Sequence, residues 1–149
     1  MPSPNSKNQY SYKYKGRVYP TFSFATRLHD FILDESGGLP GFKDEGALRS
    51  ALEAPVRSLN AQDAYYTFFE KVAAMGYLVA RNHPFHDGNK RTSLFLMLKT
   101  LEWNSYYPRW TQDAETIVIS LLGAGYLEMT GLRHALILGC RLDTTDKML

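Results

Sequence analysis

The stretch from His83 to Ser93, HPFHDGNKRTS, holds the highest density of chemically active side chains in the sequence and lies between two helix-like segments. The second of these helices is expected to begin at about residues 88–91. Its unpaired backbone N–H groups and its positive dipole end would therefore face the loop. Lys90 and Arg91 add two positive charges at the same place. The sequence therefore predicts an anion site suited to phosphate.

Each residue type in this loop fits that chemistry. Gly88 lets the backbone turn and come close to a ligand, and Asn89 tolerates left-handed geometry while offering an amide donor. Asp87 is placed to hold Mg²⁺, which prefers oxygen ligands, against the same phosphates. Imidazole exchanges protons near neutral pH, so His83 can act as the base that takes a proton from an attacking hydroxyl. Phe85 is expected to pin the loop to the core.

The alternative is an ordinary surface loop. A lone histidine before a proline, or a Lys-Arg pair at the start of a helix, is usually exposed without a function, and we interpret His86 in that way. A chance match to the whole string at a helix–loop–helix junction is much rarer. We therefore favour a functional site.

The same stretch resembles the signature of the Fic/Doc family, His-Pro-Phe-x-Asp/Glu-Gly-Asn-Gly-Arg followed two residues later by another Arg. Many members of the family transfer AMP from ATP to a protein hydroxyl. In this sequence Lys90 stands where the pattern has Gly, and Leu94 stands where it has the second Arg. Both departures match the Doc (death-on-curing) branch, whose motif reads Asn-Lys-Arg-Thr.

Resemblance to the Doc branch implies a toxin that is a protein kinase. Such enzymes transfer the γ-phosphate of ATP to a threonine of elongation factor Tu and stop translation. By resemblance, the lysine crowds the phosphate site and the nucleotide binds in the opposite sense, with its γ-phosphate towards the attacking hydroxyl. The implied co-substrate is ATP with Mg²⁺ held by Asp87. The implied catalytic residues are His83, Asp87, Asn89, Lys90 and Arg91, and the implied nucleotide contacts are Gly88, Asn89, Lys90 and Arg91.

Two other functions remain open at this point. An AMP transferase of the wider Fic type would transfer the α-phosphate instead, and Lys90 argues against it. A catalytically silent module that binds a nucleotide or a partner protein would keep the loop without the activity.

A second segment, Gly37-Gly38-Leu39-Pro40-Gly41, followed by an aspartate and a short helix, also resembles Doc. Loops at this place in the family cover the active site and bind the backbone of the target protein as an added strand. Residues 37–43 are therefore predicted to form the substrate flap. A plain connector is the alternative.

The resemblance also implies a partner protein. Many Fic enzymes carry an inhibitory helix marked Ser/Thr-x-x-x-Glu-Gly/Asn, and no stretch of this sequence matches it, since Glu45-Gly46 has Gly41 where the hydroxyl residue belongs. Inhibition in trans is expected, by a Phd-like antitoxin whose C-terminal helix binds in a groove beside the active site.

Composition sets the broad limits. A chain of 149 residues that is 44% hydrophobic and 21% charged is typical of one globular domain with a proper core. A net charge of +2 is too small to indicate a nucleic-acid partner. Cys140 is the only cysteine and is expected in the core. Neither a signal peptide nor a long apolar run is found, so we expect no membrane insertion and a cytoplasmic protein.

The elements around the loop predict a mainly helical, all-α fold of about six helices with at most a small N-terminal β-hairpin. Residues 1–20 are interpreted as a leader and this hairpin, 21–142 as a Fic/Doc domain, and 143–149 as a frayed tail. In the hairpin, tyrosines and lysines alternate, a pattern that can bind nucleic acid but more often packs one aromatic face on the body. The predicted helices follow Thr21, follow Asp44, span 62–80, lead up to Trp103, follow Thr111 and follow Thr130.

The spacing of apolar residues also predicts which helix faces are buried. In the helix after Thr21 the buried set is Phe24, Ala25, Leu28, Phe31 and Ile32. In the helix after Thr111 it is Ala114, Ile117, Val118, Leu121 and Leu122. His29 and Asp30 diverge on their helix, so they are expected to be structural rather than a catalytic pair.

Overall fold

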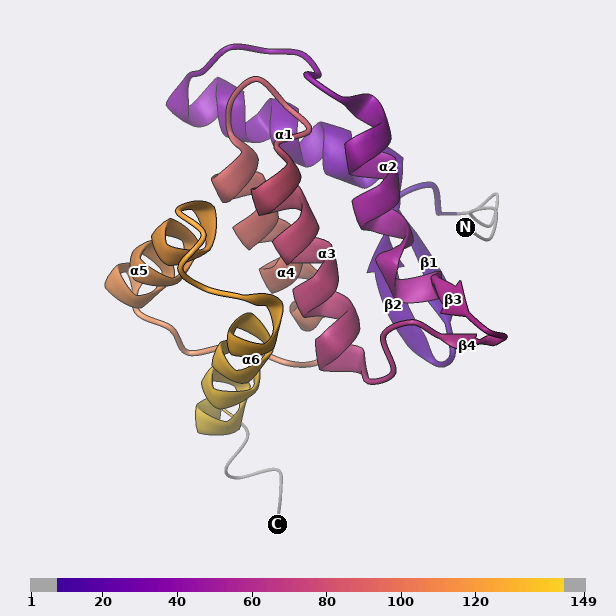
Figure 1. Ribbon diagram of the computed structural model, residues 1–149. Helices are drawn as coiled ribbons and strands as arrows, with labels where there is room; N and C mark the ends of the chain where they lie inside the picture. The colour runs from indigo at the N-terminus through magenta and orange to yellow at the C-terminus, as the bar shows by residue number, and fades with distance from the viewer. Residues whose placement is uncertain (1–7, 144–149) are drawn as a thin grey trace.

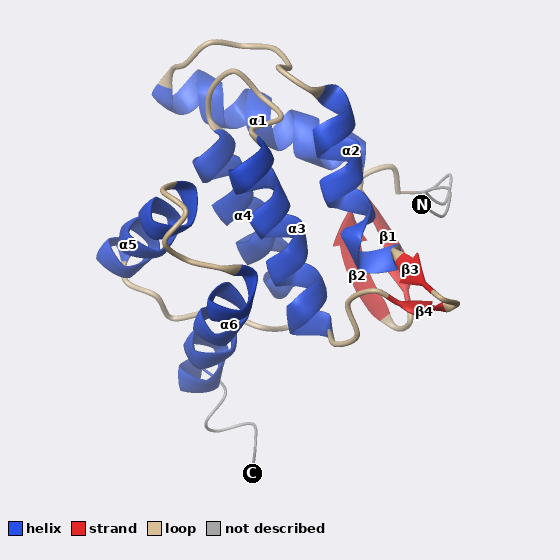
Figure 2. Ribbon diagram, in the orientation of Figure 1, coloured by secondary structure: helices blue, strands red, loops and turns tan. Residues whose placement is uncertain are grey.

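The computed structural model describes residues 8–143, and within this range the chain is mainly helical, as predicted (Figures 1 and 2). The helices are α1 (Phe22–Ser36), α2 (Glu45–Glu53), α3 (Phe68–Asn82), α4 (Asn89–Trp103), α5 (Gln112–Gly123) and α6 (Met129–Asp143), with a short 3₁₀ helix at Ala54–Val56. Four short strands form two hairpins, β1 (Ser11–Tyr14) with β2 (Arg17–Pro20) and β3 (Ser58–Leu59) with β4 (Gln62–Asp63).

Helices α3 and α4 form a central hairpin of helices, and the other helices pack around it (Figure 1). The two helices come very close at Gly76 of α3, where the side chain of Met97 from α4 fills the space that a Cβ would need. In the next turn, the Ser93 hydroxyl donates to the carbonyl of Gly76 at 2.6 Å. This close packing fixes the positions of the two helix ends that carry the loop at 83–88.

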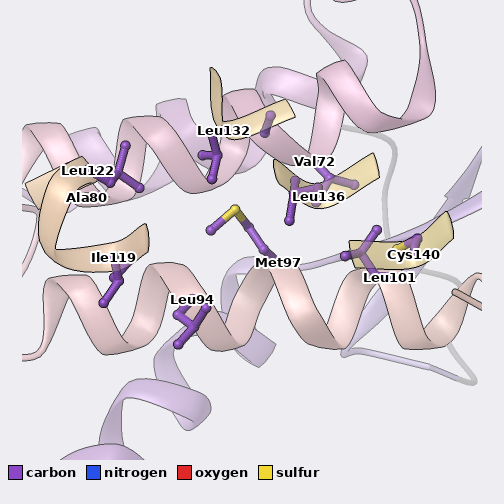
Figure 3. Close-up of a cluster of buried hydrophobic side chains, with 11 residues drawn as sticks. Val72, Ala80, Leu94, Met97, Leu101, Ile119, Leu122, Leu132, Leu136 and Cys140 are labelled. Carbon is purple, nitrogen blue, oxygen red and sulfur yellow. The ribbon is translucent and has the colours of Figure 1, made fainter. Parts of the chain in front are cut away.

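Two clusters of buried side chains hold the fold together. The larger lies among α3, α4, α5 and α6 and includes Val72, Leu101, Leu122 and Leu136 (Figure 3). The smaller lies between α1, α2 and the central pair, and it includes Phe85 from the predicted loop. The prediction that Phe85 pins the loop to the core is confirmed, since only 2% of its surface is exposed.

Helix starts follow the predicted caps. The side chains of Thr21, Asp44 and Thr111 each accept a hydrogen bond from a backbone N–H in the first turn of α1, α2 and α5. Thr67 does the same for α3. Gly37 ends α1, as expected from the glycine-rich stretch that follows it.

The N-terminal hairpin is also confirmed. Its register pairs Tyr12 with Tyr19, and both side chains are buried while the lysines between them face outward. In a strand, every second side chain points to the same face. Tyr12 and Tyr19 therefore lie on the face of the hairpin that packs against the rest of the protein. The tyrosines are therefore packing residues.

The helix predicted over 62–80 is wrong at its start. Residues 62–63 form strand β4, and the helix begins at Phe68. Asn60 and Ala61 both have positive φ angles, 52° and 64°, which is the geometry of a tight two-residue hairpin turn. An alanine in such a turn gives no sequence signal, so the hairpin was not predicted.

Three residues predicted to be buried are exposed. Phe31 of α1 is 62% exposed, and Ile117 and Leu121 of α5 are 59% and 41% exposed. The side of α5 that faces α3 and α4 carries Ile119 and Leu122 instead. The apolar residues have helical spacing in both helices. The neighbouring elements, however, bury a narrower face of each helix than the face over which these apolar residues are spread.

The proposed leader and tail fall mostly outside the described range, which leaves out residues 1–7 and 144–149. Among the described helices, none combines the length and apolar character needed to cross a lipid bilayer. Cys140 is buried in the larger cluster, as expected.

Candidate active site

The loop between α3 and α4 is held in shape by its own residues. Helix α3 ends at Asn82, and His83 caps it in the left-handed region with φ 47°. The side chain of Asn89 spans the loop, because its Oδ1 accepts from the N–H of Phe85 and its Nδ2 donates to the carbonyl of Phe85, both at 2.9 Å. Asn89 is buried, so this pair of hydrogen bonds forms away from competing water.

The first turn of α4 follows this loop directly, and its backbone N–H groups have no partner within the helix. Gly88 precedes the helix with φ 80°, and the N–H of Thr92 donates to the carbonyl of Gly88 at 2.9 Å. The N–H groups of residues 89–91 come before that first backbone bond, at the open end of the helix. Because the dipole adds positive potential there, this end attracts anions.

The predicted site residues lie together around one cavity of about 260 Å³. Its walls are His83, His86, Asp87, Gly88, Asn89, Lys90 and Arg91. His86 is exposed, as expected for loop surface, yet it also lines the cavity. Pockets that enclose a drug-sized ligand are typically larger, on the order of 300–1,000 Å³, so this cavity would enclose only part of such a ligand.

The predicted flap lies directly against the loop, as the chain arching over the α3–α4 connection in Figure 1 shows. The N–H of Leu39 donates to Oδ2 of Asp87 at 2.7 Å, and the N–H of His86 donates to the carbonyl of Gly41 at 3.2 Å. Phe42 and Phe85 pair as an isolated antiparallel bridge. Residues 37–43 thus already form a short strand contact with the motif.

The two cations of the motif contact different parts of the fold. The guanidinium of Arg91 donates to the Ser36 hydroxyl and, at 3.5 Å, to the carbonyl of Gly37, where α1 ends and the flap begins. The stem of Lys90 lies directly against Gly123 of α5. The site is therefore bordered by α1 and by α5 as well as by its own helix pair.

His29 and Ser36 belong to the site although neither was predicted to. His29 is buried, its Nε2 lies 2.7 Å from the carbonyl oxygen of Asp87, and its ring stacks on Phe85. A signal for His29 was present, since it follows Ala25 by four residues and precedes Ile32 by three on the buried stripe. Nothing in the sequence around Ser36 points to Arg91.

The residues fit a magnesium ion that arrives with a phosphate ligand. Asp87 is exposed in the cavity beside the start of α4, and hard cations such as Mg²⁺ take one or two carboxylates plus phosphate oxygens and water. In residues 8–143 no group of three or more His, Cys, Asp or Glu side chains is arranged to hold a metal by itself.

Sequence comparison agrees with this geometry. A sequence model described as Fic/DOC family matches residues 19–101, more than half of the chain. The chain belongs to the Fic/DOC family.

Named relatives are from the Doc branch, which confirms the resemblance seen in the motif. The chain is 38% identical over 77 residues to "Protein kinase doc" of Escherichia phage P1, a match that covers 52% of this chain and 60% of that protein. It is 40% identical over 57 residues to "Toxin Doc" of Mycolicibacterium smegmatis, covering 38% of this chain and 44% of that protein. The chain thus matches less than two thirds of the length of either relative.

Proposed function

We propose that this chain is a Doc-like toxin that transfers the γ-phosphate of ATP to a serine or threonine hydroxyl of a protein. The observation that carries the proposal is the cavity at the start of α4, where a base, a carboxylate and two cations surround unpaired backbone N–H groups. One named relative is a protein kinase and the other a toxin, which supports the same activity class.

The phosphate chain is expected to bind at the open end of α4. The N–H groups of residues 89–91 and the side chains of Lys90 and Arg91 all supply positive potential at this end of the helix. The size of the cavity leaves the base and ribose outside it. Asp87 would hold Mg²⁺, and that ion, when bound, neutralises phosphate charge.

In the proposed step, the hydroxyl oxygen of the substrate forms a bond to the γ-phosphorus while the bond from that phosphorus to the β–γ bridging oxygen breaks. ADP is the leaving group, and the hydroxyl proton goes to His83. Phosphoryl transfer requires mostly positioning and charge neutralisation, which these side chains can supply. The substitution of glycine by Lys90 favours transfer of the γ-phosphate over transfer of AMP.

The flap is the proposed binding site for the target. Residues 37–43 already pair with the motif through the Phe42–Phe85 bridge, so the neighbouring backbone can accept a further strand on its outer side. Such pairing would bring a substrate hydroxyl alongside His83. Elongation factor Tu is the target that the resemblance implies, and a Phd-like antitoxin is the implied inhibitor.

The experiment that tests the proposal incubates the purified chain with elongation factor Tu, Mg²⁺ and ATP labelled on either the α- or the γ-phosphate. We expect label on a threonine or serine of the target from γ-labelled ATP only, located by mass spectrometry.

Other results would point elsewhere. Label from the α-position alone would identify an AMP transferase. Absence of transfer to any protein of a cell extract, combined with unchanged growth of cells that express the chain without a partner, would identify a silent binding module.

A further inference from the structure

His29 of α1 contacts the loop between α3 and α4 at three residues, Phe85, Asp87 and Gly88. Its Nε2 lies 2.7 Å from the carbonyl oxygen of Asp87, and its ring is nearly parallel to that of Phe85, with centroids 3.6 Å apart. The ring also lies beside Gly88, where a Cβ would be 3.4 Å from it. Only 3% of the surface of His29 is exposed.

This contact fixes which nitrogen of the ring carries a proton. A carbonyl oxygen only accepts hydrogen bonds, so Nε2 must be the donor. A donor in such a buried place has no water to replace its partner. The carbonyl of Asp87 is thereby directed into the protein, towards α1.

The direction of that carbonyl determines the direction of the next N–H. The peptide between Asp87 and Gly88 is trans, and in a trans peptide the C=O and the N–H point in opposite directions. Because the carbonyl points to His29, the N–H of Gly88 points away from α1, on the side where Gly88 lines the cavity. No acceptor for this N–H is found within residues 8–143.

Gly88 makes this arrangement easy to reverse. Its φ of 80° is open to glycine without strain, and a glycine also accepts the backbone angles of the rotated peptide. Rotation of the 87–88 peptide would put a carbonyl oxygen, which repels phosphate, where the N–H now is. A contact from outside the loop is therefore needed to hold the 87–88 peptide in one orientation.

We propose that His29 is a positioning residue that holds the 87–88 peptide with its N–H towards the phosphate and its carbonyl away from it. The inference rests on the proposed function for its ligand, ATP. His29 touches neither the nucleotide nor the hydroxyl, and it acts through the peptide of Asp87 and Gly88.

Two substitutions test separately the hydrogen-bond donor and the aromatic ring of His29. H29Q keeps an amide N–H near the place of Nε2 but has no ring, whereas H29F keeps the ring on Phe85 but has no donor. We expect H29F to raise the KM for ATP by about tenfold with a smaller change in kcat, as for the loss of one strong hydrogen bond to phosphate. H29Q should stay within about threefold of the unsubstituted chain.

A second measurement reports on the peptide directly. The amide resonance of Gly88 should shift on addition of ATP in the unsubstituted chain and in H29Q, and it should lose this response in H29F. A crystal structure of H29F should show the carbonyl of residue 87 turned into the cavity. If H29F does not fold, H29M replaces it, because methionine matches glutamine in shape and lacks the donor.

The outcomes are distinct. If H29F binds ATP normally with Gly88 N–H still responding, or if H29Q and H29F lose affinity equally in proportion to lost stability, the positioning role is wrong. If the unsubstituted chain binds ATP but transfers no phosphate, the kinase proposal fails while the binding comparison still decides the role of His29. If it binds no ATP, the orientation of the 87–88 peptide in the H29F crystal structure decides that role.

Discussion

At the scale of single residues, the charged groups of the site each have a contact in the fold and a proposed contact with the ligand. Asp87 accepts from the N–H of Leu39, and Arg91 donates to Ser36 and Gly37. Leu39 and Gly37 belong to the proposed flap, and Ser36 is the last residue of α1 before it. Binding of metal and phosphate by these two side chains would therefore compete with contacts that hold the flap, which links ligand binding to flap position.

His83 is expected to be needed for the chemical step and not for binding ATP. Its side chain lines the cavity and is exposed, so H83A removes a proton acceptor without opening the core. A general base typically contributes about 10²–10⁴-fold in rate, and kcat should fall by that order. Calorimetric titration with ATP should give nearly unchanged affinity; an equally large loss of affinity would indicate a structural role.

Asp87 is expected to serve both the metal and the flap, and two substitutions separate these roles. D87N keeps an oxygen that can accept from Leu39 but loses the charge, whereas D87A loses both. Both variants should require more Mg²⁺ for half-maximal transfer. Only D87A should speed amide hydrogen exchange at Leu39. Normal transfer by D87N at ordinary Mg²⁺ would show that Asp87 is not the metal ligand.

At the scale of elements, the site depends on how closely α3 and α4 pack. The loop at 83–88 can only keep its shape if the helices that flank it are fixed, and at Gly76 the side chain of Met97 from α4 fills the space that a Cβ on α3 would need. Ser93 adds a buried hydrogen bond to the carbonyl of Gly76. A substitution in the middle of α3 should therefore alter the shape of the loop at 83–88.

G76A is expected to destabilise the protein although alanine is the better helix former. The gain in helix propensity is about 1 kcal/mol, whereas forcing extra volume against a fully buried Met97 typically costs about 1–3 kcal/mol. Chemical denaturation measures the net change. The double variant G76A/M97A should lose less than the sum of the two single variants, because the smaller residue 97 makes room.

G123A is the matched control for this prediction. It also adds a methyl group to a helical glycine, but the side chain in its way is the exposed and flexible Lys90. Stability should change little. Equal destabilisation by G76A and G123A would show that the buried Met97 side chain does not account for the cost of G76A.

At the scale of the whole molecule, a polar cluster around Asp63 joins the N-terminal hairpin to a distant stretch of the chain, residues 55–71. Its carboxylate accepts from the Tyr14 hydroxyl at 2.6 Å, from Lys15 at 3.0 Å and from the buried Lys71 at 3.0 Å. Lys71 also donates to the carbonyl of Pro55. The cluster thus connects both hairpins and the 3₁₀ helix to α3, on the side away from the candidate site.

This cluster should make stability depend on pH. The hydrogen bond from Tyr14, followed by those from Lys15 and Lys71, holds the pKa of Asp63 well below its usual range. The folded protein therefore binds fewer protons at this carboxyl than the unfolded chain, whose value is about 3.9. The stabilisation is complete above that value and is lost as the pH falls below it.

We expect the free energy of unfolding to fall more steeply between about pH 5 and about pH 2 for the unsubstituted chain than for D63N. Urea denaturation at a series of pH values measures both slopes. Other carboxylates, such as Glu70, are common to both proteins and cancel in the comparison. Parallel curves would show that Asp63 is not responsible for the pH dependence.

Much of the fold followed from local features of the sequence. Thr21, Asp44 and Thr111 start helices because their side chains bond to backbone groups only three residues away. The loop from His83 to Ser93 was recognisable because its ligand groups are contiguous and face the end of a helix. Such features need no knowledge of the rest of the chain.

What the sequence could not decide was set by contacts between distant residues. His29 and Ser36 join the site only because α1 packs against α4, and Phe31 is exposed because no element covers that side of α1 within the described chain. The sequence by itself determined the chemistry of the loop and the helices that carry it, since both depend on neighbours in the chain. Only the tertiary structure decided which backbone groups face the cavity, because a peptide's direction depends on a partner that lies elsewhere in the chain.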